Sequence, residues 1–120
     1  MKKTVVLGAS SNPVRFSYKA VKSLLRHNIE VVPVGFRGGE IEEVEILTGQ
    51  PGIENVHTVS LYIGSSRQEE YYDYIISLHP ERVIFNPGTV NPAFMARLEN
   101  REGIQAVGEC MLVMLNEGTY

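Results

Sequence analysis

Tryptophan is absent from this chain of 120 residues, and cysteine occurs once, as Cys110. A single cysteine excludes an intrachain disulfide and is typical of a reducing compartment. Apolar runs are short: Met111 to Leu115, for example, is far below the ~20 residues that cross a bilayer. No apolar segment of signal-peptide length follows Lys2 and Lys3. These absences predict a cytoplasmic protein that does not enter a membrane.

A strong charge of either sign is also lacking. The net charge is -3, and charged residues make up 21% of the chain. This balance argues against a nucleic-acid surface. Apolar residues reach 43%, which is enough for one hydrophobic core in a chain of this length. We therefore expect a single domain over residues 1–120.

Recognisable metal and catalytic motifs are missing as well. No pair among His27, His57 and His79 has metal-ligand spacing, and there is no Cys-x-x-Cys. Nor does a His/Asp or Cys/His arrangement have a recognisable catalytic spacing. We predict no metal site and no complete catalytic site. For Cys110 we favour a buried structural role over that of a reactive thiol at a helix start.

What the chain does have is a regular alternation of apolar strands and helical patterns. Strands are expected at 4–7, 29–34, 44–47, 57–63, 82–85 and 104–107, and helices beginning near residues 16, 71, 92 and 110. Such alternation predicts an α/β fold with a doubly wound, mainly parallel sheet covered by helices on both faces, a three-layer sandwich.

The first predicted helix has the clearest pattern. Phe16 is expected to share its apolar face with Ala20, Val21, Leu24 and Leu25. Ser17 is a candidate for its amino-terminal cap, and Asn28 is expected to end it in the left-handed conformation.

The segment from Gly8 to Pro13 follows the first strand and is small and polar. Open parallel sheets bind ligands beyond the carboxyl ends of their strands. A glycine followed by small residues and a helix start lets phosphate oxygens approach main-chain amides. We favour phosphate binding here over the alternative of a strand-to-helix turn that binds nothing.

This loop differs from the standard phosphate-binding motifs. After Gly8 the next glycine is Gly35, so neither G-x-G-x-x-G nor a Walker lysine motif is present. The second strand ends in Gly35-Phe36-Arg37, without the acidic residue that holds an NAD ribose. Arg37 is either an ordinary exposed arginine or a ligand for the 3′-phosphate of coenzyme A or the 2′-phosphate of NADP.

Several segments together resemble one known family. They are Val5 to Ser10, Asn12-Pro13, Phe16-Ser17-Tyr18, Val31 to Val34, Phe85 to Gly88, and Cys110. The chain is similar in these segments to the small stand-alone CoA-binding domains, a Rossmann-like family akin to the amino-terminal domain of the succinyl-CoA synthetase α subunit. It departs from them at Gly35-Phe36-Arg37, where the family usually has Asn-Pro-Lys or similar.

The resemblance implies that coenzyme A or an acyl-CoA binds along the loops that leave the strands. The candidate residues are Gly8, Ala9, Ser10, Asn12, Pro13, Arg15, Phe16, Ser17, Tyr18, Gly35, Phe36, Arg37, Ile63, Gly64, Asn86, Pro87, Gly88 and Thr89. We interpret the chain as a binding module for a small-molecule nucleotide cofactor, and we leave open a protein partner of unknown identity. The alternatives are an enzyme that uses NADP or another nucleotide, which we favour less, and a fragment of an acyl-CoA ligase.

Overall fold

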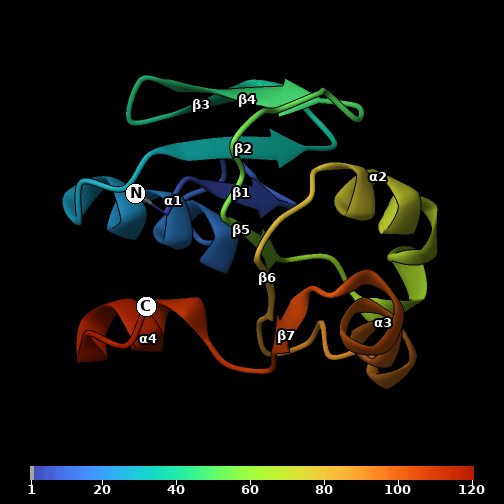
Figure 1. The fold of residues 1–120 in the computed structure, drawn as a ribbon. Coiled ribbons are helices and arrows are strands. Elements are labelled where there is room, and N and C mark those ends of the chain that lie inside the picture. The colour runs from blue at the N-terminus through green and yellow to red at the C-terminus, as the bar shows by residue number, and fades with distance from the viewer. Residues whose placement is uncertain (1) are drawn as a thin grey trace.

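A seven-stranded sheet forms the centre of the computed structural model, which describes residues 2–120 (Figure 1). In spatial order the strands are β3 (Gly39–Ile41), β4 (Val44–Thr48), β2 (Val31–Gly35), β1 (Thr4–Leu7), β5 (Thr58–Leu61), β6 (Arg82–Phe85) and β7 (Gln105–Val107). Every neighbouring pair is parallel except β3 and β4. The predicted doubly wound, mainly parallel sheet is therefore confirmed.

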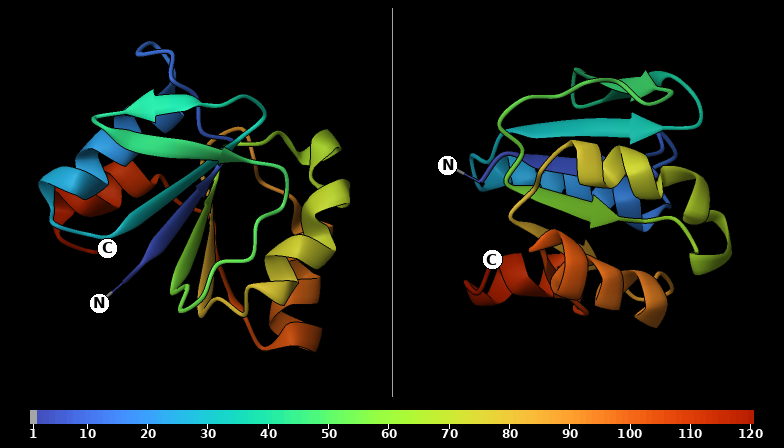
Figure 2. Two further views of the ribbon diagram at one scale, coloured as in Figure 1. Left: turned by 90° about the horizontal axis from the view of Figure 1, so that it is seen from above. Right: turned by 45° about the vertical axis from the view of Figure 1, so that its right-hand side comes forward.

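Helices cover both faces of this sheet (Figure 2). One face carries α1 (Phe16–Arg26) and α4 (Met111–Glu117), and the other carries α2 (Tyr72–Ser77) and α3 (Pro92–Arg97). Short 3-10 turns, η1 (Ser65–Arg67) and η2 (Glu69–Tyr71), precede α2, and a π-helical turn, η3 (Leu98–Glu102), follows α3. No helix within residues 2–120 is long and apolar enough to cross a membrane.

The alternation of side chains along β1 divides the core into two halves. Val5 and Leu7 pack toward α2 and α3, whereas Val6 packs toward α1 and α4. All three side chains are at most 2% exposed. A strand buried on both faces is mostly apolar, which is why Val5, Val6 and Leu7 form an unbroken apolar run.

The face of α1 that enters the core differs from the predicted one. Phe16 was expected on the apolar face but is 66% exposed, and Ser17 is buried instead. Ser17 does not cap the helix: Arg15 occupies that position, and no side chain caps the free amides. The buried residues are Ser17, Ala20, Val21 and Leu24, so the prediction is correct for Ala20, Val21 and Leu24 and differs in the first turn of the helix. Asn28 adopts the expected left-handed conformation after the helix, with φ 57°.

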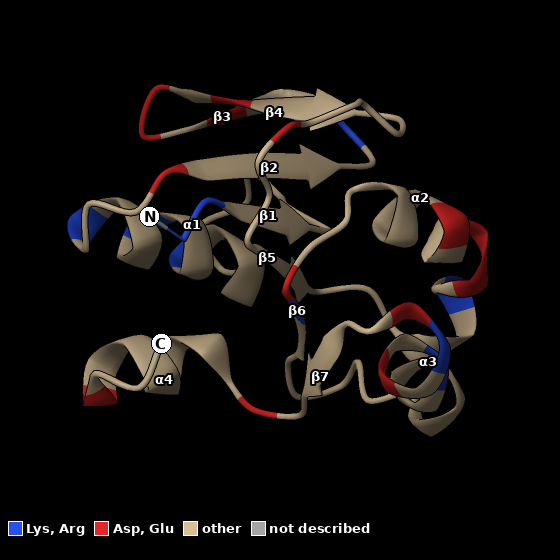
Figure 3. Ribbon diagram, viewed as in Figure 1, with Lys and Arg blue, Asp and Glu red and all other residues tan. Residues whose placement is uncertain are grey.

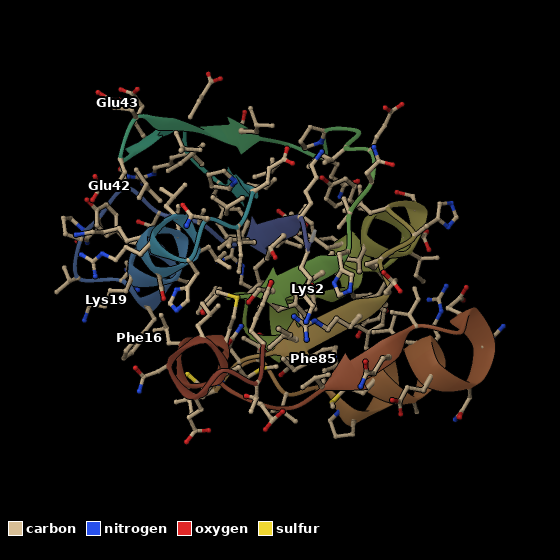
Figure 4. The ribbon with its side chains drawn as sticks, turned by 60° about the vertical axis from the view of Figure 1, so that its left-hand side comes forward. Lys2, Phe16, Lys19, Glu42, Glu43 and Phe85 are labelled. Carbon is tan, nitrogen blue, oxygen red and sulfur yellow. The ribbon has the colours of Figure 1, made fainter. Side chains whose placement is uncertain are left out.

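The antiparallel hairpin of β3 and β4 contains one strand that the sequence prediction missed. Glu42 and Glu43 form its two-residue turn, with φ values of 49° and 69° (Figure 4). Asparagine and glycine are the usual residues at such positive φ values, so two glutamates give no hairpin signal. Because β4 runs parallel to β2, this turn lies at the amino-terminal end of the sheet, and Glu42 pairs there with Lys22 at 3.5 Å.

Both described ends of the chain also lie at the amino-terminal end of the sheet. Arg82, which is buried, donates to Thr58 Oγ1 at 2.8 Å and to the main-chain oxygen of Tyr120 at 3.1 Å. These contacts tie the carboxyl terminus of the chain to the amino-terminal ends of β5 and β6. The opposite, carboxyl-terminal edge is left for the loops that contain the candidate residues.

Candidate functional site

The order of the strands reverses between β1 and β5. From β1 the chain continues to β2 on one side, and from β5 it continues to β6 on the other. Crevices at such a reversal are the usual ligand sites of open α/β sheets. Gly35 is the last residue of β2, and the other candidate residues lie on the loops or helix start that follow β1, β2, β5 and β6, so the fold brings them to one edge.

Gly8 makes the tight turn that leaves β1. Its φ is 101°, and a Cβ atom at this position would lie 2.7 Å from the main-chain oxygen of Tyr62. The amides of Gly8 and Ala9 both donate to the main-chain oxygen of Val34, at 2.8 and 2.9 Å. These two amides were expected to face a ligand, but β2 already uses them. The glycine is required here by the close packing of neighbouring strands.

Close main-chain packing also requires a glycine at position 35. A Cβ atom on Gly35 would lie 2.2 Å from the main-chain oxygen of Ala9. No side chain fits at this distance, so the loop after β1 and the end of β2 are held in direct main-chain contact. The structure therefore gives these glycines an internal packing role.

Amides without an internal acceptor occur further along the same loop. Ser10 and Ser11 donate their amides to no acceptor within residues 2–120. The same holds for the first three amides of α1, those of Phe16, Ser17 and Tyr18. Uncapped amides at a helix start carry the positive end of the helix dipole and attract anions.

The polar side chains of the loop hold its shape. Ser10 Oγ accepts the amide of Asn12 at 3.1 Å, and Asn12 Oδ1 accepts the amide of Val14 at the same distance. The main-chain oxygen of Asn12 accepts the amide of Arg15 at 3.0 Å. Local bonds of this kind are how serine and asparagine fix turns. Asn12 and Arg15 are otherwise exposed beside the start of α1.

A narrow crevice separates the turn after β1 from the turn after β2. Leu7, Gly8, Val34, Gly35, Phe36, Ile63 and Tyr71 line it. It is too narrow to admit a water-sized sphere, whereas common ligand pockets hold roughly 300–1,000 Å³. Phe36 forms its rim and is 49% exposed, and the following residue, Arg37, is also exposed.

The loop after β6 is fixed by a buried amide. Asn86 is 1% exposed, and its Nδ2 donates to Ser60 Oγ at 2.8 Å and to the main-chain oxygen of Leu61 at 2.9 Å. Its Oδ1 accepts the amide of Met111 at 2.8 Å. All the polar atoms of this side chain are therefore used inside the protein. Thr89 is likewise buried and donates its hydroxyl to the main-chain oxygen of Asn86, while Pro87 and Gly88 remain exposed.

A second buried amide supports the loop that contains Gly64. Gln68 is fully buried, and its Nε2 donates to the main-chain oxygens of Ile63 and Thr89 at 2.8 and 2.7 Å. Asn91 donates to Gln68 Oε1 and accepts the amide of Phe94 at the start of α3. This network rigidly joins the loops after β5 and β6. Sequence reasoning missed Gln68, because a polar residue in an exposed-looking stretch gives no local sign of burial.

Tyr62 and Cys110 lie on the side of this edge that faces α4. The hydroxyl of Tyr62 is buried without a hydrogen-bond partner in the described part of the chain, and burial raises the pKa of the phenol. Cys110 directly precedes α4 and is half-buried. Residues 2–120 contain no cluster of histidine, cysteine or carboxylate side chains suited to a metal ion.

Taken together, the strand reversal, the uncapped start of α1 and the crevice define a Rossmann-like α/β domain with its candidate ligand edge at the carboxyl ends of the strands. Residues 2–116 match the CoA binding domain family, and the chain belongs to this family.

Solved structures share this fold. A crystal structure of an uncharacterized protein is 46% identical over 100% of this chain and 98% of its own, with a TM-score of 0.96. A Thermus thermophilus protein is 22% identical over 99% of this chain and 90% of its own, with a TM-score of 0.86.

A larger protein contains the same fold as one part. A dinucleotide-forming acetyl-coenzyme A synthetase from Ca. Korarchaeum cryptofilum, solved with phosphate and ADP, is 14% identical with a TM-score of 0.75. The match covers 90% of this chain and 25% of the synthetase chain. No curated protein shows significant similarity to this chain.

Proposed function

We propose that this domain binds coenzyme A or an acyl-CoA as a stand-alone binding module. The observation that carries the proposal is the set of uncapped amides of Phe16, Ser17 and Tyr18 beside those of Ser10 and Ser11. They lie at the strand reversal in a chain that belongs to the CoA binding domain family. A diphosphate placed there would accept several of these amides at once.

The neighbouring side chains suit the rest of such a ligand. Arg15 lies directly before α1, and Arg37 follows the crevice. Both are exposed, and neither forms an ion pair with another residue of the described chain. In this proposal Arg15 holds the diphosphate and Arg37 holds the phosphate on the ribose. No large block of positive charge is needed for this, and Figure 3 shows the charges dispersed over the molecule.

The pantetheine arm of the ligand would pass the loops after β5 and β6. Gly64 has no atom within 4 Å of the place where a Cβ would lie, and Pro87 and Gly88 are exposed beside it. A flexible pantetheine arm needs an open, mostly uncharged path of this kind. In this proposal Asn86 and Thr89 act through the loop that they shape, since their polar side-chain atoms are used internally.

Calorimetry with coenzyme A, 3′-dephospho-coenzyme A and NADP tests the proposal. We expect coenzyme A to bind most tightly, and Arg37→Ala to weaken coenzyme A by about tenfold, as loss of one exposed charge-assisted contact predicts. The same variant should leave dephospho-coenzyme A unchanged. Preferential binding of NADP would favour a reductase-type function, and the absence of heat with all three ligands would exclude the proposal.

A further inference from the structure

The helices α1 and α4 lie side by side on one face of the sheet, and no other helix or strand of residues 2–120 covers their outer side (Figure 2). A groove of about 330 Å³ lies between them. Its lining residues are Ser23, His27, Leu112, Val113 and Asn116. Although Val113 is apolar, it is 49% exposed. The outer side of this helix pair is therefore an open surface with a hollow along its middle.

A second exposed apolar side chain lies on the same side of α1. Phe16 is seven residues before Ser23, so the two share one line along the helix. The ring of Phe16 is 66% exposed, and the ammonium of Lys19 lies 5.2 Å from its centroid (Figure 4). With Val113 on α4, the surface has apolar side chains on both helices, as the centre of a protein interface requires.

The charges on this surface are divided between the two helices (Figure 3). The helix α1 contains three basic residues and no acidic one, whereas residues 109–117 contain two glutamates and no basic residue. One of these charges, that of Lys22, is paired with Glu42. The other four are exposed and form no ion pair within residues 2–120; they are Lys19, Arg26, Glu109 and Glu117.

These four charges lie at two matching levels along the helices. Both helices follow parallel strands, so both run from the carboxyl-terminal edge of the sheet toward its amino-terminal end (Figure 1). Ser23 of α1 and Val113 of α4 line the same groove and give a common reference level. Counted from these two residues, the basic side chains lie four positions before and three after, and the glutamates four before and four after. A helix rises 1.5 Å per residue, so the two levels are roughly 10–12 Å apart.

Lys19 is therefore level with Glu109, and Arg26 is level with Glu117. A second copy related by a twofold axis parallel to the helices would place its α4 over α1 and its α1 over α4. Each base would then meet a glutamate of the other copy, which gives four ion pairs. A twofold axis across the helices would instead place α1 on α1 and bring like charges together.

We propose that the outer side of α1 and α4 is a self-complementary dimer interface whose occupant is a second copy of this chain, with Lys19 paired to Glu109 and Arg26 to Glu117 across the twofold axis. The inference goes beyond the proposed function and does not depend on it. Because the axis runs along the helices, the carboxyl-terminal edges of both sheets lie at the same end of the dimer. The surface is small and its ion pairs are exposed, so we expect dissociation constants between micromolar and millimolar.

Sedimentation equilibrium of the ligand-free protein measures the association. The mean mass should rise with concentration from that of one chain, 13.4 kDa, toward that of two. Salt screens exposed charges, so the association should weaken between about 0.05 M and about 0.5 M sodium chloride.

Reversal of one charge at a time tests the pairing. Lys19→Glu leaves glutamates at both positions of its level, and Glu109→Lys leaves lysines at both. Each variant alone should self-associate at least about tenfold more weakly, because two attractive pairs become repulsive. An equal mixture of the two variants restores opposite charges in both pairs and should form a heterodimer with about the wild-type affinity.

A matched control makes the same change of charge elsewhere. Arg101→Glu lies in η3 on the opposite face of the sheet, at an exposed side chain, and should associate as the wild type does. Lys19 and Glu109 are also exposed, so we expect thermal unfolding of both variants to match that of the wild type.

Three results would overturn the proposal. The first is a wild-type protein that keeps the mass of one chain up to millimolar concentration. The second is wild-type association that Lys19→Glu and Glu109→Lys leave unchanged, since the contact would then lie on another surface. The third is a mixture of the two variants that stays monomeric where the wild type associates, because the predicted pairs would then be absent.

Discussion

The side-chain oxygen of Asn86 accepts the main-chain amide of Met111 over 2.8 Å, and this bond joins the end of β6 to the first residue of α4. The same side chain donates to Ser60 and Leu61 at the end of β5. One buried amide therefore holds a helix and two strands in register at the carboxyl-terminal edge of the sheet. The Asn86-Pro87-Gly88 segment, which resembles the family, therefore has a structural role, because Asn86 fixes the loop after β6.

Removal of this amide should destabilise the protein strongly. Asn86→Ala leaves the amide of Met111 and the main-chain oxygen of Leu61 unpaired in the interior. We expect the free energy of unfolding to fall by about 2–4 kcal/mol, since each buried unpaired group costs roughly 1–3 kcal/mol. Urea denaturation measures the change. Ser60→Ala removes one acceptor only and should cost about 1 kcal/mol; equal losses in the two variants would contradict this account.

A methyl group on Gly64 tests the path of the ligand. Gly64 has an ordinary φ of -59° and open space around the position of a Cβ, so Gly64→Ala should fold with unchanged stability. In the proposed complex the methyl group would project into the ligand, and we expect the affinity for coenzyme A to fall by about tenfold, ~1.4 kcal/mol. Gly38→Ala, also in open space, is the matched control. Wild-type affinity in Gly64→Ala would show that the ligand takes another route.

The turn between β3 and β4 offers a gain in stability. Glu43 has a φ of 69°, where a Cβ costs an L-residue roughly 1–2 kcal/mol. Glu43→Gly removes this strain but increases the freedom of the unfolded chain. We expect a net gain of about 0.5–1 kcal/mol in thermal denaturation. Glu43→Ala keeps the Cβ and should gain nothing, and a similar gain in both variants would assign the effect to lost negative charge.

His57 should make stability depend on pH in mildly acidic solution. Burial lowers its pKa from 6.5, and the nearby Arg82 and Lys2 act in the same direction, against the opposing effect of Glu81. The unfolded chain therefore takes up the proton at a higher pH than the folded protein. Stability is unaffected by this group above about pH 6.5 and falls as the pH drops from there toward the folded pKa.

Comparison of variants isolates this contribution from that of the carboxylates. His57→Gln should lose the part of the pH dependence that lies just below pH 6.5, measured as the midpoint of urea unfolding. His27→Gln, which changes an exposed histidine elsewhere in the chain, is the control for loss of a histidine. An unchanged slope in His57→Gln would show that its proton affinity is the same in the folded and unfolded states.

The sequence by itself determined the kind of fold and the edge at which a ligand is to be sought. Residues 5–7 and 83–85 are apolar at every position because both strands are buried on both faces, so the strands are recognisable locally. The start of α3 was equally clear, because Asn91 caps the helix and Pro92 occupies its first position. Alternation of such strands with helices leaves few topologies, and the doubly wound sheet is one of them.

Tertiary structure decided which face of α1 is buried and which distant residues contact one another. The register of α1 in the core placed Ser17 inside and Phe16 outside, because contacts with the sheet and α4 select one face of a helix whose pattern allowed either. The pairing of the Gly8 and Ala9 amides with Val34, and the stacking of Arg67 on Phe36, join residues more than twenty positions apart. Hydrogen bonds and stacking of this kind depend on distances set by the whole sheet, so no local stretch of the chain contains a sign of them.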